Sequence, residues 1–306
     1  MTPRLSILLA TAAAPVVWGT TYIVTTELLP PDRPLTASML RALPAGLLLL
    51  AFVRVLPKRD WWLRVLVLGA LNFSVFWFLL FEAAYRLPGG VAATVGALQP
   101  LFVLFLARVL VAAPLKPAAV LAAAVGVAGV VLLVIGPGAT FDPIGILAGL
   151  GSAASMSAGV VLSQRWRPPV PAVAFTAWQL TAGGALLLPV ALLTEPALPM
   201  PSVSHLAGFL WLAVPGAALT YILWFRGIER LGSTAVAPLG LLSPVTAVLL
   251  GWGLLGQSLD GLQLLGIAMV LASVWAGRRV QEPTTVDPAM ANHDIARGYR
   301  SEDEHV

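Results

Sequence analysis

Long apolar stretches alternate with short polar joins along most of the chain. A helix that crosses a bilayer needs about 20 mainly apolar residues. Ten such stretches follow one another, at 5–29, 35–53, 62–87, 89–111, 117–136, 143–164, 171–193, 205–226, 233–255 and 261–277. Proline and glycine mark many of the joins, most of which are too short to hold a folded domain. The pattern predicts an all-α integral membrane protein with ten transmembrane helices.

Composition supports this fold class and excludes several functions. Of 306 residues, 58% are hydrophobic and 10% charged, whereas a soluble domain carries about 25% charged residues. Ten of the charged residues lie from Arg278 onward, so we expect 280–306 to be a disordered cytoplasmic tail. The chain has no cysteine and three scattered histidines, and its basic residues form no continuous face. We therefore expect no metal, no cofactor and no nucleic-acid partner.

Lysine and arginine near the ends of membrane spans indicate orientation. Only Arg33 and Arg86 fall on the side opposite to the N-terminus, and Arg41 lies inside the second stretch. The N-terminal side carries a much larger set: Arg4, Arg54, Lys58, Arg59, Arg64, Arg108, Lys116, Arg165, Arg167, Arg226, Arg230, Arg278 and Arg279. This bias predicts that both termini lie in the cytoplasm.

The chain contains an internal repeat. Residues 86–100, RLPGGVAATVGALQP, align without gaps on residues 230–244, RLGSTAVAPLGLLSP, and six positions are identical. The same spacing pairs Gly129 with Ser273. A slightly shorter constant spacing earlier in the chain pairs Trp18 with Met156, Arg41 with Gln179 and Gly46 with Gly184. Each half then holds five spans, an odd number, so the second half enters the membrane inverted, as in many secondary transporters. The predicted repeats are 1–136 and 137–279.

Three features together resemble the EamA-type transporters of the drug/metabolite transporter superfamily. They are Trp18-Gly19-Thr20-Thr21-Tyr22, the duplicated segments leading to Pro100 and Pro244, and the glycine-containing last span of each half. The resemblance covers residues 5–277. It implies a cavity enclosed mainly by spans 1–4 and 6–9, with spans 5 and 10 at the periphery, and transport of small metabolites, commonly outward.

The chain departs from that family at one point. Relatives often have Gly-Glu after the fourth and ninth spans, whereas this chain has Gly256-Gln257 after the ninth and Ala113 at the equivalent first-half position. A packing or gating role of that glutamate is therefore not carried over to this chain.

Arg41 is the most informative candidate residue. A cation at the bilayer centre costs about 2.5–3.5 kcal/mol on insertion scales, so Arg41 either binds a substrate carboxylate or reaches back to the interface along its own helix. Its repeat mate Gln179 offers a polar group at the equivalent depth of the other half. The proton-coupling candidates are Glu82, which is spaced to pair with Arg86 on one helix face, and Glu27 at the end of the first span.

Polar and aromatic residues supply the other candidates. Pro100 and Pro244 are expected to kink their spans, and the neighbouring Gln99 and Ser243 could face a central cavity. The remaining predicted cavity residues are Trp18, Tyr22, Asn72, Trp77, Tyr221 and Trp224. The glycines and serines of the sixth span and Gly183-Gly184 are interpreted as sites of close helix packing.

The function that these features favour is secondary active transport. The chain has no Gly-x-x-x-x-Gly-Lys-Ser/Thr loop for ATP, so a substrate or proton gradient would drive it. We expect an exporter of amino acids or related amphipathic solutes in the inner or plasma membrane of a bacterium. A multidrug or nucleobase-type efflux carrier is the alternative. An intramembrane enzyme would need a catalytic set of residues inside the bilayer, which the predicted spans lack. A channel should line its pore with repeated polar rings.

Overall fold

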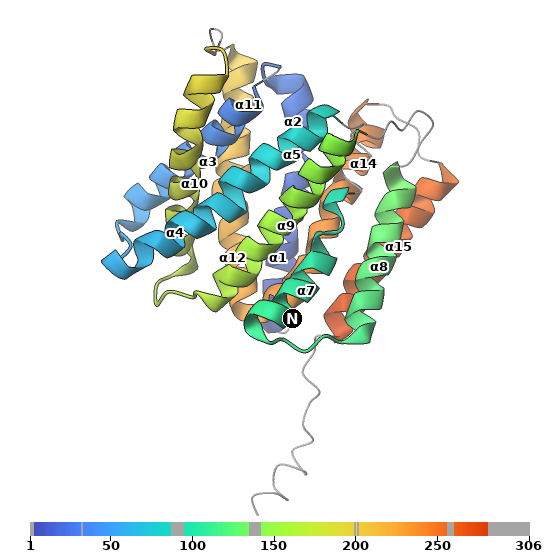
Figure 1. The fold of residues 1–306 in the computed structure, drawn as a ribbon. Coiled ribbons are helices and arrows are strands. Elements are labelled where there is room, and N and C mark those ends of the chain that lie inside the picture. Colours follow the sequence, from blue (N-terminus) through green and yellow to red (C-terminus); the bar gives the residue numbers. More distant parts are fainter. Residues whose placement is uncertain are drawn as a thin grey trace, which may run out of the picture.

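The computed structural model describes residues 3–31, 33–86, 95–134, 142–198, 200, 202–255 and 260–280. Over these residues the chain forms a bundle of helices without a β-strand (Figure 1). The predicted all-α fold class is therefore confirmed. Apart from Val280, the predicted tail lies outside the described residues, as does Gln257.

Irregular turns divide two of the apolar stretches of the first half. The first stretch is shared by two α-helices, and the third contains a π-helical segment, η2, in which Asn72 lies. The elements are α1 (Pro3–Gly19), α2 (Thr21–Leu28), α3 (Pro34–Val53), the 3₁₀-helix η1 (Arg59–Trp61), α4 (Trp62–Gly69), η2 (Ala70–Ser74), α5 (Val75–Arg86), α7 (Gln99–Val111) and α8 (Pro117–Val134).

The second half has a π-helical segment at the corresponding place. This segment, η3, contains Pro215, whose missing N–H removes a backbone hydrogen bond from the regular helix. The elements are α9 (Pro143–Arg165), α10 (Ala172–Thr194), α11 (Val203–Ala213), η3 (Val214–Leu219), α12 (Thr220–Leu231), α13 (Ser233–Val236), the 3₁₀-helix η4 (Ala237–Leu241), α14 (Leu242–Leu255) and α15 (Gly261–Val280).

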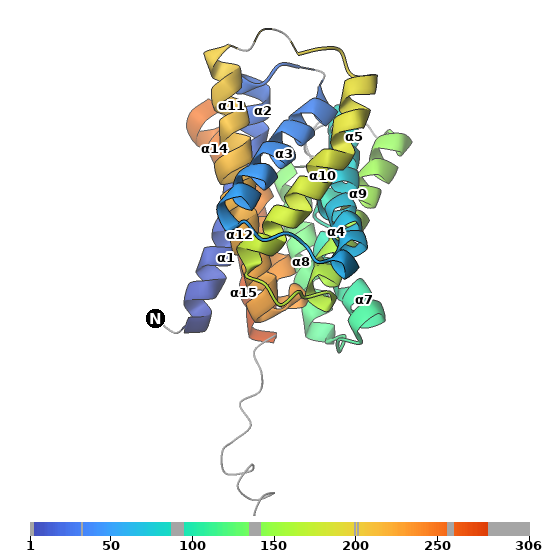
Figure 2. The same cartoon turned by 90° about the vertical axis from the view of Figure 1, so that its left-hand side faces the viewer.

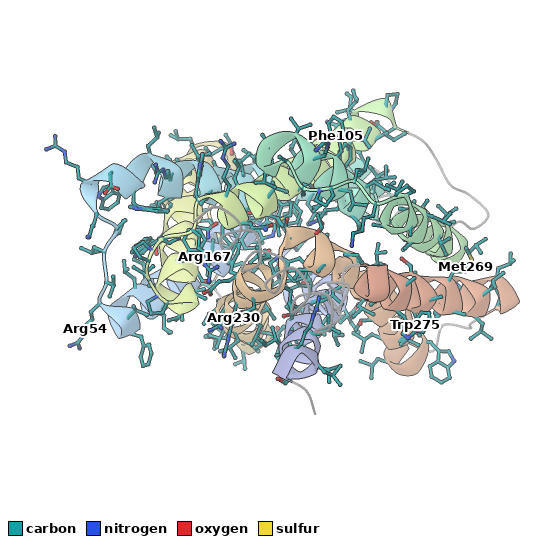
Figure 3. The ribbon with its side chains drawn as sticks, turned by 90° about the horizontal axis from the view of Figure 1, so that it is seen from below. Arg54, Phe105, Arg167, Arg230, Met269 and Trp275 are labelled. Atoms are coloured by element: carbon teal, nitrogen blue, oxygen red, sulfur yellow. The ribbon has the colours of Figure 1, made fainter. Side chains whose placement is uncertain are left out.

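Seven helical segments of the described chain are long and apolar enough to cross a membrane: Arg4–Thr25, Pro34–Val53, Arg59–Ala83, Pro143–Arg165, Ala172–Thr194, Val203–Leu231 and Ser233–Leu254. Three shorter apolar helices, Gln99–Val111, Pro117–Leu132 and Gly261–Gly277, occupy the stretches predicted as the fourth, fifth and tenth spans. Large apolar side chains such as Phe105 and Trp275 lie at the outside of the bundle (Figure 3). A count of ten spans stays a prediction.

Helices at corresponding positions of the two predicted repeats pack against each other. α3 and α10 lie side by side (Figure 2), and the repeat mates Gly46 and Gly184 form their contact. A Cβ atom on Gly184 would lie 2.6 Å from the Cα of Leu43, and one on Gly46 would meet the backbone of Thr181. The interpretation of Gly184 as a site of close packing is therefore confirmed.

α8 and α15 form a second pair at one edge of the bundle (Figure 1). A Cβ on Gly129 would lie 2.8 Å from the carbonyl oxygen of Gly266. Their position at the edge agrees with the peripheral place that the family resemblance implied for the fifth and tenth spans.

Helix directions differ between the two halves. α1 begins at the lower end of the bundle in Figure 1, and α15 also ends there. α9, which corresponds to α1 in the predicted repeat, begins at the upper end and runs downward.

Candidate functional site

Five aromatic side chains from both halves pack together between the helices. This aromatic cluster consists of Trp18, Phe73, Trp77, Tyr221 and Trp224. Ring centroids lie 4.8 Å apart for Trp18 and Tyr221, 5.0 Å for Trp18 and Trp224, and 4.7 Å for Phe73 and Tyr221. The rings are tilted or edge-on to one another, the arrangement that aromatic pairs prefer. Trp77, Tyr221 and Trp224 are at most 2% exposed.

Arg41 lies against this cluster. Its side chain is buried, its Nη2 donates a 2.9 Å hydrogen bond to the carbonyl of Gly216, and its guanidinium carbon lies 4.7 Å from the ring centroid of Trp77. A carbonyl dipole and an aromatic face both stabilise a cation. Arg41 is thus held inside the protein, with its charge near residues of both halves.

A group of amide and hydroxyl side chains forms a second polar site. Asn72 Nδ2 donates to Gln179 Oε1 at 2.8 Å and to Ser163 Oγ at 3.2 Å, and both amide side chains are fully buried. Gln179 Nε2 donates in turn to the carbonyl of Phe175 at 3.4 Å. This amide network of Asn72, Ser163 and Gln179 joins η2 of one half to α9 and α10 of the other.

The indole N–H groups of Trp18 and Trp224 differ in their hydrogen bonding. Trp18 Nε1 donates to Thr220 Oγ1 at 3.0 Å. Trp224 Nε1 is buried and has no hydrogen-bond partner within the described part of the chain. A buried donor without an acceptor costs about 1–3 kcal/mol, so an acceptor brought by a ligand would remove a penalty here.

The remaining predicted site residues add no side-chain hydrogen bond to this centre among the described residues, or their side chains are not described. Gln99 and Ser243 are partly buried, and their side chains make no hydrogen bond among the described residues. Pro100 lies in the first turn of α7, where proline breaks no helical hydrogen bond, and Pro244 is the third residue of α14. Both prolines therefore lie near the start of a helix, and each follows an irregular turn. The side chain of Tyr22 is not among those described.

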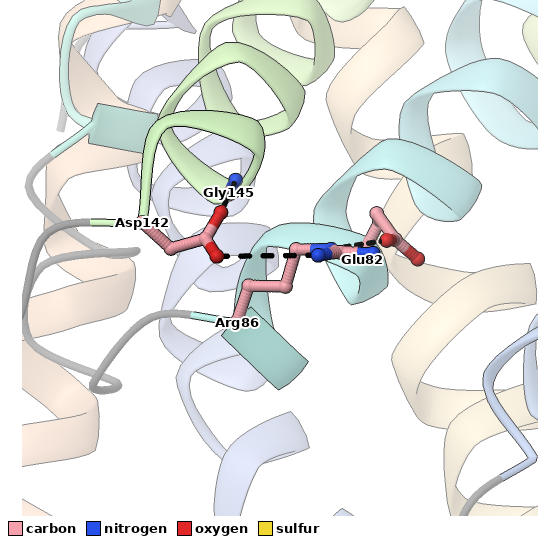
Figure 4. A network of polar contacts seen from close by, with 4 residues as sticks. All are labelled: Glu82, Arg86, Asp142 and Gly145. Atoms are coloured by element: carbon pink, nitrogen blue, oxygen red, sulfur yellow. Dashed lines mark hydrogen bonds and ion pairs between the residues drawn. The ribbon is translucent and has the colours of Figure 1, made fainter.

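The two candidate acids face the surface. Glu82 Oε1 accepts from Arg86 Nε at 2.5 Å, as the spacing predicted, and Arg86 Nη1 lies 4.0 Å from Asp142 Oδ2 (Figure 4). Asp142 also caps α9 by accepting from the Gly145 N–H at 2.8 Å. Glu27 is exposed. A proton-coupling role for either acid stays a prediction.

A cavity of about 210 Å³ opens at the lower end. Ser163 and Phe175 line its inner wall, so it reaches the amide network, and an Arg167–Glu229 ion pair of 2.6 Å lies among its lining residues. Figure 3 looks onto this end, where Arg54, Arg167 and Arg230 lie. The lower cavity thus connects the lower end of the bundle with Ser163 of the amide network.

Sequence reasoning missed several contributors to the centre, because they are backbone groups or ordinary side chains: the Gly216 carbonyl, Ser163, Thr220 and Phe73. Two signals point to Gly216. Pro215 precedes it within an apolar helix, and the spacing that pairs Arg86 with Arg230 also pairs Asn72 with Gly216. Within the described residues, no group of three or more metal-ligating side chains is present.

The chain resembles known transporters along most of its length. The EamA-like transporter family matches it twice, over residues 5–135 and 143–276. The protein PecM of Dickeya dadantii is 46% identical over 263 residues, which cover 85% of this chain and 88% of PecM. The "Uncharacterized inner membrane transporter YedA" of Escherichia coli is 29% identical, over 85% of this chain and 86% of its own length.

Two further similarities concern a more distant relative and the fold. A Salmonella typhimurium protein named "Probable amino-acid metabolite efflux pump" is 26% identical, over 85% of this chain and 90% of that protein. A protein of known crystal structure superposes with a TM-score of 0.78 at 23% identity, covering 91% of this chain and 99% of the other. The chain belongs to the EamA-like transporter family and is a multi-pass membrane transporter.

Proposed function

We propose that this protein is a secondary active exporter of small amphipathic metabolites, such as amino acids and related solutes, that works by alternating access. The observation that carries the proposal is the buried Arg41 guanidinium, held by the Gly216 carbonyl and the Trp77 face. A cation that is kept inside a membrane protein, beside aromatic rings from both halves, suits a solute with one anionic and one apolar part.

The proposed topology is ten spans in two inverted five-helix repeats, with both termini in the cytoplasm. Support comes from the opposite directions of α1 and α9, and from the shared lower end of α1 and α15. Basic residues gather at that end, as expected of a cytoplasmic face. The name of the YedA relative favours the inner membrane of a bacterium.

The proposed binding site lies where the two repeats meet. Arg41 would bind the anionic group, the aromatic cluster would contact the apolar part, and the Trp224 N–H would donate to an acceptor of the solute. Tyr22, Asn72, Gln99, Gln179 and Ser243 belong to the proposed lining. Because the rings are in contact with one another, a solute must separate the halves to enter, and the lower cavity supplies the approach from the cytoplasm.

The test is counterflow in proteoliposomes with radiolabelled amino acids and small metabolites. Arg41→Gln removes a charged interaction worth roughly 1.5–3 kcal/mol, so uptake at low substrate should fall about tenfold or more. Arg64→Gln is the matched control: Arg64 also lies over a ring, 5.0 Å from the centroid of Trp61, but is exposed. Normal counterflow by Arg41→Gln would remove Arg41 from the site.

A further inference from the structure

A second cavity lies between α1 and α12, which come from different halves of the chain. Its volume is about 220 Å³, and its lining residues are Ser6, Ile7, Ala10, Thr11, Leu223 and Arg226. Ser6, Ala10 and Arg226 are exposed, so this α1–α12 groove is open to the outside of the bundle. Its inner side is closed by helix contact, because a Cβ atom on Gly227 would clash with the side chain of Thr11.

The charged residue of this groove is Arg226. Its guanidinium makes no ion pair or hydrogen bond within the described part of the chain. Glu229, three positions later on α12, pairs with Arg167 at 2.6 Å, and its charge is thereby engaged elsewhere. Arg230, one turn beyond Arg226, is also exposed and lies at the lower end of the bundle (Figure 3). The groove therefore presents an unpaired guanidinium on the basic end of the molecule.

An apolar face continues from Arg226 toward the middle of the membrane segment. Arg226, Leu223 and Leu219 follow one another at spacings of three and four residues, so they share one helix face. Leu219 is 55% exposed and belongs to Val203–Leu231, a segment long and apolar enough to cross a membrane. In a bilayer this face therefore meets acyl chains. Across the groove, Ala10 on α1 has a short side chain, which leaves space beside the two leucines.

We propose that the α1–α12 groove binds an anionic phospholipid, with the phosphate at Arg226 and an acyl chain along Leu223 and Leu219. A guanidinium matches the geometry of a phosphate, and basic pockets between transmembrane helices suit anionic head groups. Ser6 adds a hydroxyl in the first turn of α1, where the helix dipole also favours an anion. Leu219 is seven residues from Arg226, about 10 Å along the helix, so one chain reaches both.

A lipid in this groove joins the two halves beside the aromatic cluster. α1 carries Trp18, and α12 carries Tyr221 and Trp224, whose ring centroids lie 4.8 and 5.0 Å from that of Trp18. Because the lipid contacts both helices, it stabilises the arrangement in which these rings touch. The bound lipid therefore favours this conformation over one in which α1 and α12 have moved apart.

The test compares phosphatidylglycerol with phosphatidylcholine of the same acyl chains, added to delipidated protein in detergent. Native mass spectrometry counts the bound lipid, and the melting temperature reports stabilisation. We expect phosphatidylglycerol to bind more tightly and to stabilise more. Arg226→Gln should weaken its binding about fivefold or more, whereas Arg226→Lys keeps the charge and should lose less. Arg108→Gln is the matched control, because Arg108 is an exposed arginine in the last turn of α7 and lines neither cavity.

A second variant tests the apolar part of the groove. Ala10→Leu leaves the charge unchanged and fills the space for the acyl chain, so it should also weaken phosphatidylglycerol binding. Ala124→Leu, at an exposed position of α8, should not. Equal binding of the two lipids, or equal effects of Arg226→Gln and Arg108→Gln, would overturn the site. Stabilisation by inorganic phosphate equal to that by phosphatidylglycerol would replace the lipid with a soluble anion. None of these measurements requires transport, so their outcome is independent of the proposed function.

Discussion

Glu195, the residue after α10, caps the start of α3: its Oε1 accepts a 2.6 Å hydrogen bond from the backbone N–H of Leu35. Its Oε2 accepts another from Thr36 at 2.7 Å. A carboxylate at a helix N-terminus satisfies unbonded N–H groups and complements the helix dipole. One side chain thus joins the two helices that pack through Gly46 and Gly184.

Removal of this cap should destabilise the fold. Glu195→Ala should lower the free energy of unfolding by about 1–2 kcal/mol, measured as a lower melting temperature in detergent. Glu195→Gln keeps an oxygen acceptor and should lose less. Equal melting temperatures for Glu195→Ala and the unmodified protein would show that the cap is unimportant.

The contact between α3 and α10 should tolerate no added methyl group. In Gly184→Ala the new Cβ would meet the Cα of Leu43, and such overpacking costs about 1–3 kcal/mol. Gly253→Ala is the control, because nothing lies within 4 Å of a Cβ there and alanine favours a helix. Folded yield and melting temperature should fall for Gly184→Ala alone, and a fall in both variants would contradict this explanation.

The ring beneath Arg41 should contribute to substrate affinity. Trp77→Leu removes the aromatic face that the guanidinium contacts at 4.7 Å, an interaction worth about 1–2 kcal/mol when desolvated. Loss of affinity should therefore approach tenfold, while Trp77→Phe keeps a weaker face and loses less. Saturation curves of counterflow give the substrate affinity of each variant. Equal affinities for Trp77→Leu and Trp77→Phe would exclude a cation–π contribution.

A proton-coupling role of Glu82 is separable from its role in the ion pair. Because the Glu82–Arg86 pair is partly exposed, Glu82→Gln should change the free energy of unfolding by no more than about 1 kcal/mol. If Glu82 carries the proton, that variant keeps counterflow without a pH gradient and loses its acceleration by the gradient. Glu27→Gln should retain the acceleration, and the opposite result would transfer the role to Glu27.

The cysteine-free chain allows a direct test of topology. Arg54 lies at the lower end, shown in Figure 3, and Met200, between α10 and α11, is 92% exposed. A membrane-impermeant thiol reagent added to intact cells should label Met200→Cys and leave Arg54→Cys unlabelled until the membrane is permeabilised. The reverse labelling would place the termini outside the cytoplasm.

The local pattern of the sequence was enough to predict the helices, the paired glycines and the candidate polar residues. A bilayer requires long apolar helices, so their positions are visible in hydropathy alone, and an internal repeat aligns Arg41 with Gln179 and Gly46 with Gly184 without any coordinates.

The tertiary structure alone decided which groups meet. Spacing places Asn72 and Gln179 in different halves, and only packing shows that they share a hydrogen bond. The partner of Arg41 is a backbone carbonyl, which every residue possesses and no sequence pattern marks. Glu195 was overlooked for a similar reason: its N–H partners lie in a helix 160 positions earlier in the chain. Contacts of this kind depend on where the chain brings its backbone, and hydropathy and residue type do not encode that position locally.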